Sequence, residues 1–250
     1  MPYTVKSRKA PTVQTSAPRS PLSRVRVIAE ALTLADQAGL DGLSMRALAE
    51  RLGVVPMALY KHVSNKEELL DALVDAVIAE VAPGTVDGGW KAQAREQLLA
   101  ARRTMLRHPW AWRAIETREA PSPAALDRME VMIATLRAGG LSAPLVHHVM
   151  HALGSRLWGF SQEVFATGPQ PTDPGIAAQA MEMMAARWPR VLESAMSTLH
   201  QQGSAVGPGC DDETEYLFAI DLILDGAERL HDAGWSPAAR SDGAPWVTLQ

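Results

Sequence analysis

Helix start and stop signals recur along almost the whole of this sequence, and they constrain its fold more than any other feature. Capping residues precede prolines or apolar residues that repeat every three or four positions, and glycine or proline ends most of these stretches. No long stretch alternates apolar and polar residues, which is the pattern of a half-buried strand. The sequence therefore predicts an all-α fold.

The signals also divide the chain into parts. Residues 1–19 carry four basic residues, no acidic residue and little apolar periodicity, which predicts a disordered basic arm. A first helical domain is expected over 20–82 and a second over 88–234, with a tail over 235–250. A length of 250 residues allows two unequal domains of this kind.

Four helices are expected within residues 20–82, and each has its own start signal: Ser20-Pro21, Ser44, Pro56, and a capping box of Ser64 with Glu67. Gly39, Gly53 and Pro83 are expected to end the first, second and fourth helices. The second and third helices, joined by a tight turn at Gly53, follow the helix-turn-helix plan, whose second helix enters the major groove of DNA.

The second domain shows the same punctuation. Ser122-Pro123, Ser142 and Asp173-Pro174 start helices, and Pro189 interrupts the last of these three. The expected helices cover residues 90–107, 110–116, 123–139, 142–167, 174–202 and 212–232.

Charge is distributed unevenly along the chain, although the formal net charge is only −4. Up to His62 there are nine Lys or Arg residues against four acidic ones, so this end carries +5 and the remainder −9. A cationic end on an anionic body favours a polyanionic partner at that end, although a chance surface distribution gives the same counts.

Residues 43–73, LSMRALAERLGVVPMALYKHVSNKEELLDAL, meet the packing demands of a helix-turn-helix. Ala49 is small where the second helix must cross closely, and Gly53 allows the positive φ of the turn. Leu48, Val54 and Leu59 can fill the wedge between the two helices. Spacing alone leaves any helical hairpin open as an alternative.

This stretch resembles the DNA-binding region of the tetracycline-repressor (TetR) family over about residues 22–80. The turn glycine, Leu59-Tyr60, His62 and Lys66 all fall in register with that family. Similarity over the C-terminal part is weaker, in helix order and in fragments such as LRAGGLS and GFSQE. The resemblance implies an N-terminal three-helix DNA-binding domain followed by a helical-bundle domain for ligand binding and dimerisation.

The same resemblance implies a homodimeric repressor that leaves a palindromic double-stranded operator when a small-molecule effector binds. Two helices of each subunit, at about 142–167 and 212–232, are expected to form the dimer. The apolar residues Leu217, Ile220, Leu224 and Ala227 form a stripe on the second of these helices. An activator, and a DNA binder without sequence preference, remain alternatives.

Residues that match DNA-contacting positions of the family carry suitable chemistry. The planar guanidinium of Arg46 suits the edge of a guanine, and apolar side chains after Val55 suit thymine methyl groups. Lys66 lies where free backbone N–H groups of a helix start also favour a phosphate. The predicted set is Ser44, Arg46, Pro56, Met57, Ala58, Tyr60, Lys61, His62 and Lys66.

Three positions in this stretch need comment. Tyr60 could instead be a wedge between helices, and His62 an ordinary surface histidine. Many relatives have a polar residue where this chain has Val55, which is a poor N-cap and leaves the operator bases open. The basic arm could follow DNA phosphates or simply keep the chain soluble.

The effector pocket is expected among the helices of residues 90–165, which hold most of the large apolar side chains. Most of these side chains are expected to fill the core. Glu163 matches a ligand-binding position of the family, and Glu116 stands where the tetracycline repressor has a metal-coordinating histidine, which argues against magnesium-tetracycline as effector. The predicted ligand set is Trp110, Trp112, Glu116, Met132, Trp158 and Glu163.

His147 and His151 stand one helical turn apart, a spacing that can supply two zinc ligands. A helical metal-binding protein or enzyme built on this pair is therefore the alternative function. A zinc protease would need glutamate at position 148, where this chain has histidine. Surface or interface histidines are the simpler interpretation, and no metal site is predicted.

Other classes of protein have little support. The chain contains no nucleophile elbow, phosphate-binding loop or dinucleotide fingerprint, so we expect neither an enzyme nor a cofactor. No run of about 18 apolar residues predicts a membrane span. The only cysteine, Cys210, cannot form an intrachain disulfide, and a cytoplasmic location is expected.

Overall fold

Local capping chemistry explains where the helices begin in the computed structural model of this chain. The structure describes residues 21–157, 173–197 and 212–237, and within them every regular element is a helix, which confirms the all-α prediction. The expected basic arm and the last part of the helix expected over 142–167 lie outside the described residues. The chain divides into two compact units, Met1–Leu73 and Val74–Gln250.

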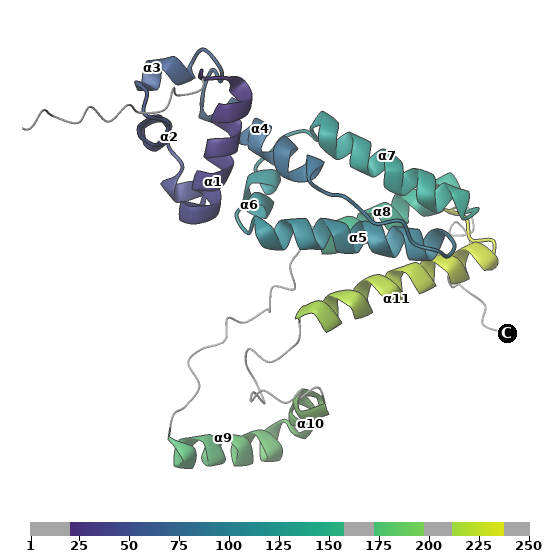
Figure 1. Ribbon diagram of the computed structural model, residues 1–250. Coiled ribbons are helices and arrows are strands. Elements are labelled where there is room, and N and C mark those ends of the chain that lie inside the picture. The colour runs from purple at the N-terminus through teal and green to yellow at the C-terminus, as the bar shows by residue number, and fades with distance from the viewer. Residues whose placement is uncertain (1–20, 158–172, 198–211, 238–250) are drawn as a thin grey trace, which may run out of the picture. The chain divides into compact units, whose positions relative to one another are not determined.

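The first unit contains three helices and the start of a fourth (Figure 1). They are α1 (Arg24–Gly42), α2 (Met45–Leu52), α3 (Pro56–Leu59) and α4 (Lys66–Ala79). The division between the two units falls inside α4. The domain limits expected from the sequence, 20–82 and 88–234, remain predictions.

Most of the predicted helix signals are confirmed. The Ser44 hydroxyl accepts a hydrogen bond from the Ala47 N–H (3.1 Å), and Gly53 ends α2 in the left-handed region at φ +67°. Pro56 is the first residue of α3, and Val55 before it makes no side-chain capping bond. Gly39 was expected to end the first helix; it interrupts α1, also at φ +67°, and the helix continues to Gly42.

The predicted start of the first helix is wrong. α1 begins at Arg24, because the hydroxyl of Ser23 accepts the Arg26 N–H at 3.2 Å. Pro21 lies before the helix. Ser20 and Ser23 are both possible N-caps. The sequence favoured Ser20 because Pro21 after it suits the first position of a helix.

The capping box of α4 is shifted by one residue from the prediction. The Asn65 side-chain oxygen accepts the Glu68 N–H (2.8 Å), and the Glu68 carboxylate accepts the Ser64 N–H (2.7 Å). The backbone bond from Ser64, followed by the hydrogen bond from Arg24, lowers the pKa of Glu68 to about 2. The residue that accepts the Ser64 N–H is thus Glu68, one position after the predicted Glu67.

A small apolar core holds the first unit together. Leu43, Leu48 and Leu59 are completely buried, and so is Val27 of α1. α2 contacts both α1 and α3. Arg24 adds a polar link, donating to the His62 carbonyl and to the Glu68 carboxylate, both at 2.6 Å.

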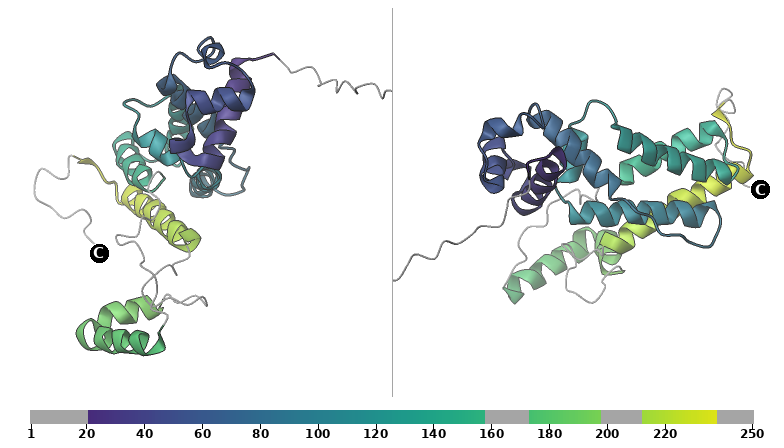
Figure 2. Two further views of the ribbon diagram at one scale, coloured as in Figure 1. Left: turned by 90° about the vertical axis from the view of Figure 1, so that its left-hand side faces the viewer. Right: turned by 45° about the horizontal axis from the view of Figure 1, so that its top comes forward.

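The second unit is built mainly from helices that run lengthwise beside one another (Figure 2). They are α5 (Trp90–Arg107), α7 (Pro123–Ala138), α8 (Ala143–Leu157) and α11 (Asp212–Asp232), and the short α6 (Ala111–Glu116) lies between α5 and α7 in the sequence. α9 (Pro174–Arg187) and α10 (Pro189–Ser197) contact each other, and Pro189 separates them as predicted. No described residue of α9 is buried.

The core of the second unit lies between α5, α7, α8 and α11. Its most deeply buried members include Leu98, Leu136, Leu145, Ile220 and Leu224. The stripe that we expected to serve dimerisation is therefore largely used inside the subunit, because Ile220, Leu224 and Ala227 face this core.

Ion pairs join α5 to α11 along the edge of this core. Lys91 donates to Asp225 (2.6 Å) and to Glu228 (2.8 Å), and Arg95 donates to Asp221 (2.7 Å). Exposed pairs of this kind contribute little individually. They orient α11 on α5 more than they stabilise the unit.

The pH dependence of stability can test the packing of Tyr216 on α11 against α5. Its hydroxyl donates to the Leu98 carbonyl at 3.1 Å, and burial raises its pKa to about 12. An unfolded tyrosine ionises at about pH 10, so the stability contributed by Tyr216 is complete below that pH and is lost as pH rises towards about 12. Denaturant midpoints across this range measure the loss.

The matched variant is Tyr216→Phe, which cannot ionise. At neutral pH it should be about 0.5–1.5 kcal/mol less stable than the parent because the buried hydrogen bond is gone. This difference should shrink as pH rises above about 10. An unchanged difference up to pH 12 would contradict the assignment of the raised pKa to Tyr216.

Candidate functional site

The helix-turn-helix of the first unit buries one set of its apolar side chains and exposes its charged ones. Leu48 and Ala49 on α2 and Leu59 on α3 are buried, as the sequence pattern predicted. Arg46 on α2 and Tyr60 after α3 are exposed, so the wedge interpretation of Tyr60 is not needed. One helix pair thus offers an apolar side to its own core and a polar side to solvent.

Five basic residues of this unit fall into two groups. Arg24 pairs with Glu68 (2.6 Å), and Arg51 pairs with Glu30 (2.9 Å). Arg46, Lys61 and Lys66 are exposed and form no ion pair within the described residues. The unpaired group belongs to the set predicted from sequence to contact DNA.

Lys66 occupies an electrostatically unusual position. It is the first residue of α4, where the N-terminal end of the helix dipole disfavours a cation. Two acids follow it, Glu67 and Glu68, and Glu68 is already bound to Arg24 and Ser64. A bound phosphate would compensate both the lysine and the free N–H groups of the helix start.

Apolar side chains complete the exposed surface. Val55 and Met57 are 69% and 70% exposed, which is unusual for side chains of this size. Pro56 lies between them and is also exposed, and Ala58 is half-buried. Such a group suits van der Waals contact with thymine methyl groups in a major groove.

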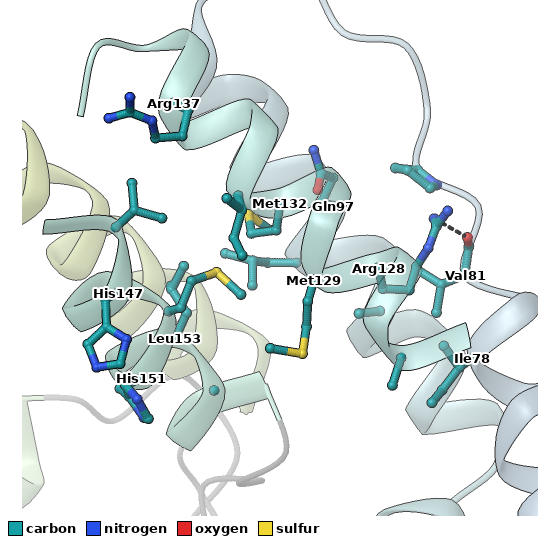
Figure 3. A pocket seen from close by; sticks show the side chains of 18 of the residues that line it. Ile78, Val81, Gln97, Arg128, Met129, Met132, Arg137, His147, His151 and Leu153 are labelled. Atoms are coloured by element: carbon teal, nitrogen blue, oxygen red, sulfur yellow. Dashed lines mark hydrogen bonds between the residues drawn. The ribbon is translucent and has the colours of Figure 1, made fainter. Parts of the chain in front are cut away.

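The second unit contains a cavity of about 530 Å³ between the end of α4, α5, α7 and α8 (Figure 3). Its wall is mostly apolar, with the flexible side chains of Met105, Met129, Met132 and Met150. Polar groups are few: Gln97, Arg128, Arg137, His147 and His151. A concave apolar site with a few polar groups is the usual form of a small-molecule site.

Hydrogen bonds fix the polar groups of the cavity. Gln97 donates from its amide to the Thr135 hydroxyl at 2.7 Å. Arg128 donates to the Val81 carbonyl at 3.2 Å, and Arg137 donates to the Leu141 carbonyl. Both arginines therefore bind backbone oxygen, and neither pairs with a carboxylate within the described residues.

Glu80, the residue before Val81, is held by hydrogen bonds of its own. Glu80 accepts hydrogen bonds from His108 Nε2 (3.0 Å) and from Arg107 (3.1 Å). Burial by itself raises the pKa of Glu80, but the bonds from His108 and Arg107 outweigh it and keep the pKa below its usual value. Two successive residues after α4 are thus tied to the helices around the cavity.

Two family models match this chain. The model for bacterial regulatory proteins of the tetR family matches residues 27–73, and the model for the tetracyclin repressor-like C-terminal domain matches residues 82–230. The two matches together span most of the chain. This chain belongs to the TetR family. It is therefore a DNA-binding transcriptional regulator, as the sequence resemblance implied.

Individual TetR-family relatives agree with this assignment. The transcriptional repressor DrrR1 of Streptomyces coeruleorubidus is 32% identical over 85% of this chain and 80% of its own. The class C tetracycline repressor of Escherichia coli is 27% identical over 84% and 92%. The crystal structure of ActR from Streptomyces coelicolor in complex with actinorhodin has a TM-score of 0.66 at 26% identity, covering 90% of this chain and 100% of that one.

The predicted ligand residues of this TetR-family chain do not gather at one place. Met132 lines the cavity, whereas Trp110, Trp112 and Glu116 are not among the residues of its wall. Trp110 is 6% exposed, and its ring meets that of His108 edge-on at 6.3 Å. Trp158 and Glu163 lie outside the described residues.

The histidine pair lies at the cavity as well. The rings of His147 and His151 are 4.6 Å apart, and both residues are exposed and line the wall. The described residues contain no group of three or more His, Cys, Asp or Glu side chains placed to hold a metal ion. The metal-binding alternative stays a hypothesis without further support.

Sequence reasoning missed the polar residues of the cavity, Gln97, Arg128 and Arg137. They stand on α5 and α7 among other polar residues, and only helix packing shows which of these face inward. A usable signal was present for Arg128, since its neighbours Ala125, Met129 and Met132 at helical spacing are apolar.

Among the described residues no helix is long and apolar enough to span a membrane.

Proposed function

We propose that this regulator is a homodimeric repressor that leaves a palindromic operator when a small molecule occupies the cavity of the second unit. The observation that carries the DNA-binding part is that Arg46, Lys61 and Lys66 are exposed and form no ion pair within the described residues. Cations without carboxylate partners are available to phosphates, whereas Arg24 and Arg51 are already engaged.

Each DNA-contacting residue has a proposed role. Arg46 reads a base edge, and the exposed Met57 with Ala58 contacts thymine methyl groups. Ser44, Tyr60 and Lys61 bind phosphates, as do His62 and Lys66 near the start of α4. Pro56 fixes the start of the recognition helix.

The cavity supplies the proposed effector site. Its volume of about 530 Å³ falls within the usual range for small-molecule pockets, roughly 300–1,000 Å³. In ActR, whose C-terminal fold this chain shares, the solved structure holds actinorhodin. An effector can release DNA only if it binds one of two states of the regulator more tightly than the other.

The proposed dimer uses α8 and α11. Phe218 and Leu222 lie one turn apart on α11 and are 66% and 63% exposed, on a different face from the buried Ile220 and Leu224. Large exposed apolar side chains at this spacing favour helix packing against a second copy. Two copies related by a twofold axis would read the two halves of a palindrome.

The test is a mobility-shift titration on the DNA upstream of the gene that encodes this chain, repeated at several salt concentrations. A repressor of this kind should bind that DNA at least about a thousandfold more tightly than random DNA. Equal affinity for both would identify a binder without sequence preference. Compounds that release the specific complex but leave non-specific binding unchanged would then identify effectors.

A further inference from the structure

One arginine of the cavity stands out by its surroundings. Arg128 on α7 is half-buried among apolar side chains, and its one hydrogen bond within the described residues goes to the Val81 carbonyl at 3.2 Å. Its other guanidinium N–H groups have no acceptor there. A cation in an apolar wall costs free energy unless an anion compensates it.

The residues of the cavity wall indicate the sign of the charge that a partner of Arg128 would carry. Among the described residues that line the cavity there is no aspartate or glutamate, whereas there are two arginines, two histidines and an amide. Figure 3 shows Arg128 near Val81, and His147 with His151 on the other side of Met129. A neutral or cationic guest would leave the Arg128 charge uncompensated.

We propose that the effector is an organic acid with an apolar body, and that its anionic group takes Arg128 away from the Val81 carbonyl. The methionine side chains surround the body, and the guanidinium binds the anion. This inference rests on the proposed function, because it assigns the chemistry of the effector to the cavity described above.

The exchange of partners is favoured by the strengths of the two bonds. Hydrogen bonds between two charged groups are roughly twice as strong as those with a neutral acceptor, and a guanidinium can hold an oxyanion by two parallel bonds. The Val81 carbonyl, by contrast, is a single neutral acceptor. It can turn to water or to another donor when the anion arrives.

The location of Val81 connects this exchange to regulation. Val81 is the second residue after α4, the helix in which the two units divide. Glu80 beside it stays bound to Arg107 and His108, and neither of these lines the cavity. Of the side-chain hydrogen bonds that Glu80 and Val81 accept within the described residues, only the one from Arg128 comes from a residue that lines the cavity.

A pair of fluorescent probes can test the sign of the charge that the cavity prefers in a ligand, without knowledge of the natural effector. Anilinonaphthalene sulfonate is an aromatic anion, and phenylnaphthylamine is the same ring system without the sulfonate. Binding of each to the full-length protein is measured by fluorescence titration. Arg128→Met should weaken the sulfonate probe about tenfold or more and change the neutral probe less than about twofold.

Arg137→Met is the matched control. Arg137 is also on α7 and at the cavity, but it lies nine positions further along the helix, about 13.5 Å, and its guanidinium donates to Leu141. In Figure 3 it stands at the opposite end of the labelled stretch from Arg128. Because Arg137 also lines the cavity, some weakening of the sulfonate probe is expected, but far less than in Arg128→Met. A loss as large as that in Arg128→Met would overturn the assignment of the anion to Arg128.

Arg128→Lys covers the case in which Arg128→Met damages the cavity itself and both probes bind poorly. If lysine restores the sulfonate probe to within about threefold of the parent, the positive charge is what matters. Failure of lysine to restore it would overturn the proposal. So would equal binding of the sulfonate probe by the parent and Arg128→Met.

Hydrogen exchange over residues 74–83 tests the second half of the proposal. The sulfonate probe should speed exchange there in the parent protein, and the neutral probe should not. Arg128→Met should show fast exchange without any probe. No change in this segment on binding the sulfonate would overturn the displacement of Val81. Neither measurement involves DNA, so a failure here is distinct from a failure of promoter binding.

Discussion

Replacing Arg46 and Tyr60 together with alanine is expected to weaken binding to the specific promoter DNA by about a hundredfold or more. A bidentate contact to a base is worth about 1–3 kcal/mol, and a dimer would lose it in both half-sites. Loss of the two tyrosine hydroxyls removes about 0.5–1.5 kcal/mol for each phosphate hydrogen bond. Mobility-shift titration at constant salt measures the loss.

Arg51→Ala provides the matched control for this experiment. Arg51 is on the same helix as Arg46, but its guanidinium is bound to Glu30 and to Gln37, each at 2.9 Å. Its removal should reduce DNA affinity far less than the double change. The unfolding temperature of the Arg46 and Tyr60 variant should equal that of the parent, because both side chains are exposed. Unchanged promoter binding by the double variant would refute the proposed DNA surface.

Leu59→Ala is expected to destabilise the first unit by about 2–5 kcal/mol and, through that, to remove DNA binding. Leu59 is completely buried and is the only buried residue of α3. A helix of four residues has almost no stability of its own, so packing of this one side chain holds it in place. Denaturant unfolding followed by circular dichroism measures the effect.

Met57→Ala distinguishes stability from recognition at the same helix. Met57 is 70% exposed, so its removal should change the free energy of unfolding by less than about 0.5 kcal/mol. The proposed contact with thymine would still be lost, which should alter the preference among operator sequences. A loss of stability comparable to that of Leu59→Ala would contradict the packing of α3 described above.

Local chemistry decided most of the features that could be predicted from sequence. The caps at Ser44 and Ser122 depend on atoms within three residues of each other, and both were predicted correctly. The errors at Ser23 and Asn65 arose where two capping residues stood close together, so that the choice depended on contacts with other helices. Arg24, for example, reaches from α1 to Glu68 and so favours the observed start of α4.

The candidate sites differ in the same way: one could be predicted from local sequence, and the other depends on contacts between distant helices. Positions of the helix-turn-helix could be assigned because they lie within one short stretch whose spacing fixes which side chains are exposed. The cavity joins α4, α5, α7 and α8, so its lining depends on helix rotations that no local pattern records. Trp110 illustrates the difficulty, since a large aromatic residue predicted for the pocket packs beside His108 instead.

By itself the sequence determined an all-helical chain, most of its helix ends, the glycine turn after α2 and the exposed cations beside it. These features follow from hydrogen bonds and backbone angles within a few residues. Only the tertiary structure decided that Ile220 and Leu224 pack inside the subunit, and that Arg128 faces a cavity and holds Val81. Burial and charge pairing between distant helices are set by packing in three dimensions, where residues far apart in the chain become neighbours.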